Sequence, residues 1–414
     1  MKLIYGLYLI LLLPVLGEFS RFELFGHSIV ISDLLIPLFI IAFLLQRRIN
    51  PLPRPALKQT RILSAFIAIA VFSLILSLID LPLNEVLNSS LYLIRLAEYI
   101  ALFPITASLL YERTARAQII KFIVFAALLI AITGFLQLSF LPSLEELAKT
   151  QGYDPHILRL VGSWLDPNFI GGFFAFIFCM FSGILLYQKK HRLLLTAFLI
   201  IIATALFLTY SRSAYVALAV GIIILGLLKS PRLLVIILII GALGISLSDR
   251  AQERVGELVT SINSVLFNSS ENPDPTARLR IQNWEQTVSL IAQKPLFGHG
   301  YNTLAYTKLN QGFIQDEDVH SASGSDSSLL TIFATTGLFG LLTYLLFLAG
   351  SLAYAFRRWR SSPDKEKGLY LGLFTALVTL IIHSCFVNSL LFPQIMIYLF
   401  ISLGLLYAGK QSHN

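Results

Sequence analysis

Long runs of hydrophobic residues alternate with shorter polar segments along almost the whole chain. The runs hold 15 to 24 residues each, close to the roughly 20 that an α-helix needs to cross a hydrocarbon core of about 30 Å. We therefore predict an all-α, polytopic integral membrane protein with about twelve transmembrane helices. The predicted spans are 3–17, 28–46, 62–80, 91–110, 120–140, 168–187, 193–209, 213–228, 233–247, 327–350, 369–387 and 389–408.

Two of the polar interruptions are much longer than the others, at about 141–167 and about 248–326. The second of them divides the chain into transmembrane helices at 1–247, a large loop at 248–326 and transmembrane helices at 327–414.

The large loop has a helical pattern of its own. Hydrophobic residues recur at helical spacing on both sides of the turn-forming stretch 268–275. We therefore predict two helices in the loop, and Thr276 is the candidate N-cap of the second.

The distribution of basic residues indicates how the helices are oriented. The chain has 414 residues, 56% of them hydrophobic and only 13% charged, with a formal net charge of +8. If Lys2 is cytoplasmic, most lysines and arginines fall in segments on that same side, as cytoplasmic loops do. We therefore predict cytoplasmic termini and two long external segments, and we do not interpret the net charge as a sign of nucleic-acid binding.

The first hydrophobic run and the two cysteines are expected to belong to the helix bundle. Residues 1–17 resemble a signal peptide, but Leu16-Gly17 is a poor cleavage site, so we expect this run to remain as the first span. Cys179 and Cys385 both lie in hydrophobic runs, so we predict small core residues rather than a disulfide or a metal site.

Ionisable residues inside predicted spans need an explanation, because a charge within a bilayer is costly. Arg95 and Glu98 lie three residues apart on one helix face and are predicted to pair, with a role in lining a site as the alternative. His383 also lies within a predicted span and is expected to be a hydrogen-bonded core residue.

Three arginines on the external side are candidates for binding an anion. Arg212 lies where the seventh and eighth predicted spans meet, and its guanidinium donors suit a phosphate or pyrophosphate, although it could be an ordinary headgroup anchor. Arg278 and Arg280 open the second loop helix. Because they point to nearly opposite sides, only one is expected to serve a given site. Both could instead be solvated.

The external segments also contain candidates for metal binding and for general base catalysis. Asp316 and Asp318, followed by His320, resemble a metal-binding motif of nucleotide-sugar transferases. Such short acidic matches are common by chance, and an external site would not meet nucleotide sugars, so we predict no metal and no other cofactor. The external candidates for a general base are His299, His320 and Asp326.

Three local patterns, taken in order, resemble the O-antigen ligase and polymerase superfamily of bacterial envelope glycan assembly. They are Arg159-Leu-Val-Gly-Ser-Trp-Leu-Asp-Pro-Asn168, then Thr209-Tyr-Ser-Arg-Ser-Ala214, and finally Arg280-Ile-Gln-Asn-Trp284 with Pro295-Leu-Phe-Gly-His-Gly300 and Thr336-Gly-Leu-Phe-Gly340. Each pattern is short, but their order and placement around one long external loop are specific. The resemblance covers about 159–345.

This resemblance implies a GT-C-like glycosyltransferase in a bacterial inner membrane, active at the periplasmic face in the biosynthesis of lipopolysaccharide or another surface polysaccharide. The donor would be a glycan on undecaprenyl pyrophosphate. The acceptor would be lipid A core for a ligase or another lipid-linked glycan for a polymerase. Catalysis would need no metal, because arginines would hold the departing pyrophosphate. Arg212 and Arg280 match the arginines of the family, and Arg159 is a further possible pyrophosphate ligand.

The chain departs from the pattern of the family at the position of its usual catalytic histidine. The family commonly has His-Asn eleven residues before the first glycine of its Gly-Leu-x-Gly turn, whereas this chain has Asp326-Ser327 eleven residues before Gly337. Asp326 is therefore the first candidate for the base, and His320, six residues earlier, is the second.

Two other functions are consistent with a polytopic membrane protein. A transporter or flippase for an anionic or lipid-linked solute would often show internal repeats or matching broken helices, and the sequence shows neither clearly. A non-catalytic assembly partner is the third hypothesis, and it would be favoured if both Asp326 and His320 were dispensable.

Overall fold

A computed structural model describes residues 2–24, 27–49, 58–146, 156–188, 190–229, 231–250, 252–253, 255–257, 260, 275–315 and 324–408. Apart from one two-stranded β-hairpin, the regular elements of this part of the chain are helices. The longer helices are α1 (Lys2–Leu16), α2 (Ser32–Ile49), α3 (Lys58–Leu76), α4 (Leu83–Leu109), α5 (Arg113–Phe140), α7 (Pro167–Tyr187), α8 (Arg192–Leu208), α9 (Arg212–Leu228), α10 (Pro231–Ser246), α12 (Pro275–Gln293), α14 (Ser328–Ser361), α15 (Asp364–Ser384) and α16 (Pro393–Tyr407).

The helices confirm an all-α, polytopic membrane protein. Each predicted hydrophobic run overlaps one of them. In the described part of the chain, seven helices are long and apolar enough to cross a membrane, and α8, α9 and α16 are shorter apolar helices. The total of twelve spans remains a prediction.

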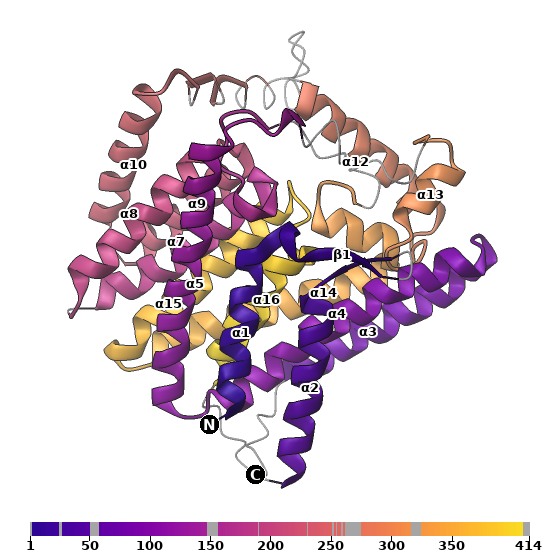
Figure 1. Cartoon of the computed structure of the whole chain (residues 1–414), viewed down its shortest axis with the longest axis horizontal. Helices are drawn as coiled ribbons and strands as arrows, with labels where there is room; N and C mark the ends of the chain where they lie inside the picture. The colour runs from indigo at the N-terminus through magenta and orange to yellow at the C-terminus, as the bar shows by residue number, and fades with distance from the viewer. Residues whose placement is uncertain are drawn as a thin grey trace.

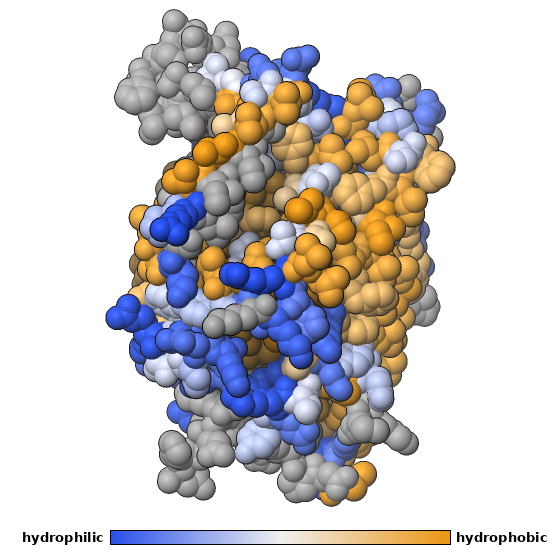
Figure 2. Space-filling model, turned by 90° about the vertical axis from the view of Figure 1, so that its left-hand side faces the viewer, coloured by the Kyte–Doolittle hydropathy of each residue, from blue (hydrophilic) through white to orange (hydrophobic). Residues whose placement is uncertain are grey.

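The surface is consistent with a lipid environment, because many large hydrophobic side chains are exposed, among them Leu38, Ile75 and Leu194. On the face shown in Figure 2, hydrophilic side chains gather over the central and lower parts, whereas hydrophobic ones cover the right-hand side.

Two details of the predicted spans are wrong. The run 28–46 does not begin as a helix, because β1 (Arg21–Leu24) and β2 (His27–Val30) form an antiparallel hairpin before α2. Arg95 forms its salt bridge with Asp33 rather than with Glu98, and donates from Nε and Nη2 to the two carboxylate oxygens at 2.8 and 2.5 Å. This bidentate pair joins α4 to the N-terminal end of α2.

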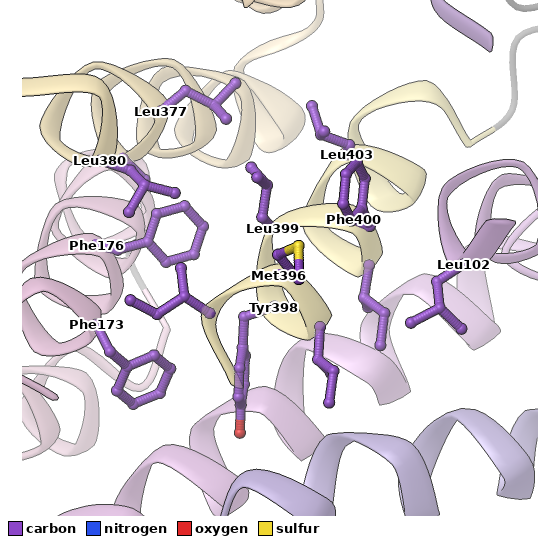
Figure 3. Packing of buried hydrophobic residues seen from close by; sticks show 14 of the residues in the cluster. Leu102, Phe173, Phe176, Leu377, Leu380, Met396, Tyr398, Leu399, Phe400 and Leu403 are labelled. Atoms are coloured by element: carbon purple, nitrogen blue, oxygen red, sulfur yellow. The ribbon is translucent and has the colours of Figure 1, made fainter. Parts of the chain in front are cut away.

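The core of the bundle lies around α7 and α15. α7 is hydrophobic on all sides, and most of it is buried, as expected of a central helix. A Cβ atom at Gly183 would lie 2.3 Å from the Cα atom of Gly372, so glycine on both helices permits their close approach. α16 packs beside them, and its residues Met396 and Leu399 belong to the same buried hydrophobic cluster as Phe176 and Leu380 (Figure 3).

Two helices of the large loop are described with their bounds, α12 and the short α13 (Leu304–Asn310), and the described residues between 249 and 260 are helical as well. The start of α1 and the end of α2 lie at one end of the bundle, and α12 and α13 lie at the other (Figure 1). The sequence missed α13. Thr276 is not the N-cap that the sequence suggested, because α12 already begins at Pro275, and proline is favoured at the first position of a helix. The predicted first loop helix falls largely outside the described residues.

Backbone hydrogen bonds attach the end of the large loop to α14. His299 and Gly300 donate N–H hydrogen bonds to the carbonyls of Ala334 and Thr335 at 2.9 and 3.1 Å. Gly337 lies inside α14 with φ 67° and ψ −169°, which kinks the helix. The loop therefore packs into the kink, so the Pro-Leu-Phe-Gly-His-Gly and Gly-Leu-Phe-Gly patterns form one structural unit.

We expect Gly337→Ala to destabilise the protein strongly. The alanine Cβ would lie 2.2 Å from the backbone of Leu296, at a positive φ that L-residues rarely adopt. We expect a loss of about 2–4 kcal/mol, since overpacking alone costs about 1–3 kcal/mol and the strained backbone about 1 kcal/mol more. The measurement is the midpoint of thermal unfolding in detergent. Gly241→Ala is the control, because nothing lies within 4 Å of a Cβ at Gly241. Equal midpoints for the two variants would contradict the expectation.

Candidate active site

The first part of the candidate site is the turn between α8 and α9. Tyr210 adopts a left-handed backbone conformation with φ 49°, and Ser211 caps α9 by accepting a hydrogen bond from the amide of Ala214. Arg159 donates from Nε to the carbonyl of Thr209 at 2.9 Å and from Nη2 to the carbonyl of Tyr210 at 3.3 Å. In this structure, Arg159 therefore contacts the turn that carries Arg212.

Arg212 is the first residue of α9, where backbone N–H groups favour an anion. Its Nη1 lies 3.4 Å from Oε2 of Glu257, and only 14% of its side chain is exposed. A carboxylate is an oxyanion, so this contact shows that the guanidinium of Arg212 is able to pair with a negatively charged oxygen.

A buried chain of hydrogen bonds runs inward from the same turn. The hydroxyl of Ser211 donates to Oδ1 of Asn168 at 3.0 Å and lies 3.1 Å from the hydroxyl of Ser213. Ser213 Oγ lies 3.3 Å from Nε2 of His383, and Nδ1 of that ring lies 2.7 Å from Ser389 Oγ. His383 is completely buried, which confirms a hydrogen-bonded core residue. It lies at the end of α15 rather than in the middle of a span.

The second part of the site is the inner face of α12. Arg280, Asn283, Trp284 and Thr287 recur at helical spacing and are buried or half-buried, whereas Arg278 is exposed. The two arginines therefore lie on different sides, as their spacing predicts. Arg280 lies close enough to His383 for its charge to act on the imidazole. His383 also contacts Ser213, the residue after Arg212, so this histidine relates Arg280 to the turn at the start of α9.

The third part of the site is Asp326, just before Ser327, the N-cap of α14. Asp326 has φ 56°, an uncommon conformation that aspartate tolerates better than most residues. Its Oδ2 accepts a hydrogen bond from Nδ2 of Asn283 at 2.9 Å. Lys308 donates to Oδ1 of the same asparagine at 2.7 Å.

α12 thus joins the arginine side of the site to the aspartate side. Arg280 and Asn283 are three residues apart, which corresponds to a rise of about 4.5 Å along a helix. Arg280 and the asparagine that contacts Asp326 therefore lie one turn apart on one face of α12.

The other candidates from the sequence are not part of this arrangement. His299 is buried, and its Nε2 donates to the carbonyl of Leu290 at 2.8 Å. Burial lowers the pKa of His299 below its ordinary value. His320, Asp316 and Asp318 lie outside the described residues. In the part of the chain that is described, no three His, Cys, Asp or Glu residues are grouped so that they could hold a metal.

The sequence did not single out Asn283 or Lys308, and it assigned His383 to the core without relating it to the arginines. Lys308 shares a helix face with Leu304 in an otherwise uncharged short helix, and this spacing was a signal for a buried lysine. Asn283 lies about one turn after Arg280 on the same face of the helix, which was a weaker signal.

The chain was compared with known protein families and with curated proteins. Residues 196–345 match the family model described as O-antigen ligase, which confirms the resemblance to the O-antigen ligase and polymerase superfamily. The match includes Arg212, Arg280 and Asp326. No curated protein matched the chain.

Proposed function

We propose that this chain, which carries an O-antigen ligase domain at 196–345, is a membrane glycosyltransferase. It moves a glycan from an undecaprenyl-pyrophosphate donor to an acceptor hydroxyl at the periplasmic face of a bacterial inner membrane. Both termini are cytoplasmic. The observation that carries this proposal is the single helix, α12, that carries both Arg280, whose charge acts on His383, and Asn283, which donates a hydrogen bond to Asp326.

The proposed reaction is a displacement at the anomeric carbon of the donor glycan. The acceptor oxygen forms the new glycosidic bond as the bond between the anomeric carbon and the phosphate oxygen breaks. The acceptor proton passes to Asp326, and undecaprenyl pyrophosphate leaves with the bonding electron pair. Asp326 is the proposed base because an ionised carboxylate is an acceptor only, held here by the amide of Asn283.

The arginines would stabilise the leaving group. Arg212 and Arg280 supply positive charge where negative charge develops, which is the usual source of catalysis in such a site. The pyrophosphate would replace the Glu257 carboxylate at Arg212. Arg159, which donates hydrogen bonds to the carbonyls of Thr209 and Tyr210, would add a further positive charge for the pyrophosphate at the same turn. Because guanidinium groups supply the charge and pyrophosphate leaves readily, the proposed reaction uses no metal.

The purified protein in nanodiscs, given a lipid-linked oligosaccharide and candidate acceptors, tests the proposal. Addition of one glycan to lipid A core would identify a ligase, and a ladder of lengthening lipid-linked products would identify a polymerase. We expect transfer to be unchanged in excess chelator. A folded sample that transfers to neither acceptor would overturn the proposal, and loss of transfer that a divalent cation restores would overturn its metal-free mechanism.

A further inference from the structure

Lys308 is a buried lysine in the external part of the protein. Only 1% of the residue is exposed, which is rare for lysine because the charged group must give up its hydration. Its Nζ donates to Oδ1 of Asn283 at 2.7 Å and to the carbonyl of Gly324 at 2.8 Å. The ammonium therefore joins α13, α12 and the segment that leads to Asp326.

The chemistry of these groups determines which way the Asn283 amide points. An ammonium can only donate, so the amide oxygen must face Lys308. The amide nitrogen then faces Asp326 and donates to Oδ2 at 2.9 Å. A carboxylate can only accept, so Lys308 and Asp326, which lie on either side of the Asn283 amide, require the same orientation of that amide.

We propose that Lys308 is a positioning residue that acts through Asn283 to orient the carboxylate of Asp326 toward the acceptor hydroxyl. This inference rests on the proposed function, because it assigns Asp326 the role of base. Lys308 itself does not touch the substrate. It donates a hydrogen bond to the Asn283 amide, which in turn donates one to the Asp326 carboxylate.

The protonation of Lys308 makes this orientation sensitive to pH. Burial lowers the pKa of Lys308 to about 8, while the charge of Asp326 acts in the opposite direction. Among the described residues around it, α12 contributes the neutral Asn283, and the segment before α14 contributes the Gly324 carbonyl and the charged Asp326. A neutral amine could accept a hydrogen bond, so the amide would no longer be held in one orientation. Transfer should therefore fall as pH rises through about 8.

The first test compares Lys308→Met with Lys294→Met. Lys294 is in the same loop and pairs with Asp80 at the surface, so it is a matched control for the loss of a lysine. We expect Lys308→Met to lower kcat about 10- to 100-fold, which corresponds to about 1.4–2.7 kcal/mol, with KM for the lipid-linked donor changed less than threefold. We expect Lys294→Met to transfer at the rate of the unmodified protein.

The second test uses the pH profile and Lys308→Arg. The guanidinium remains charged throughout the accessible range, so Lys308→Arg should transfer without the fall above pH 8 that the unmodified protein shows. A flat profile for the unmodified protein between pH 7 and pH 9.5 would overturn the inference. Equal kcat values for Lys308→Met and Lys294→Met would also overturn it and leave the proposed function standing.

A variant that folds poorly would also lose transfer, so the third test is a measurement that does not depend on transfer. The shifts in the midpoint of thermal unfolding are compared for Lys308→Met, Asp326→Asn and the double variant. Residues joined through one amide should give non-additive shifts, so additive shifts would overturn the coupling. Absence of transfer by the unmodified protein at every pH is a different outcome, because it overturns the proposed function and with it the catalytic role of this coupling.

Discussion

Replacing Asp326 with asparagine is expected to lower the rate of glycan transfer by about 10²- to 10⁴-fold, the usual contribution of a positioned general base. Asparagine has nearly the same size and also tolerates the left-handed conformation that residue 326 adopts at φ 56°. It can still accept the hydrogen bond from Asn283. The substitution therefore removes the base while it preserves the backbone. The measurement is the single-turnover rate of the purified variant in nanodiscs.

Glu285→Gln is the matched control, because it neutralises an exposed carboxylate on α12, in the same loop. We expect this control to transfer at the normal rate. Asp326→Asn should also reduce transfer far more than His320→Ala does. The reverse ranking would assign the base to His320, and full activity of both variants would favour a non-catalytic assembly partner.

Replacing Arg280 with alanine is expected to reduce transfer by about 10²- to 10³-fold, the cost of removing one charged or hydrogen-bonding group that stabilises a transition state. The physical reason is that the departing pyrophosphate would lose the cation that the inner face of α12 supplies, whose charge also acts on His383. Arg212→Ala is expected to have an effect of the same size, because Arg212 at the start of α9 is the other proposed pyrophosphate ligand. Both variants should insert into the membrane and unfold at nearly the normal temperature.

Arg278→Ala provides the control within the same helix. Arg278 lies two residues before Arg280 but is exposed, so its removal should lower transfer less than threefold at moderate ionic strength. Normal transfer by Arg280→Ala would refute a pyrophosphate role for Arg280. An equal loss in Arg278→Ala and Arg280→Ala would indicate a general effect of loop charge instead of a site.

The sequence by itself determined the membrane class, the order of the helices and the pattern that matches the O-antigen ligase family. These properties follow from local composition, because a run long and apolar enough to span a bilayer must satisfy its backbone hydrogen bonds as a helix. The sequence also indicated that Arg278 and Arg280 would lie on different sides of their helix, since helical spacing settles which residues share a face, and the family pattern selected Arg280.

Only the tertiary structure decided which distant residues meet. The partner of Arg95 is Asp33, 62 positions away, although Glu98 lies one turn from it on the same helix. Lys308 and Asn283 lie 25 positions apart, and His383 is 170 positions from Ser213. Hydrophobic periodicity predicts none of these pairings between distant positions, because it describes one helix at a time. The packing of α12 against α14, with α13 in contact with Asn283, gives Asp326 the neighbours from which its role as base is inferred.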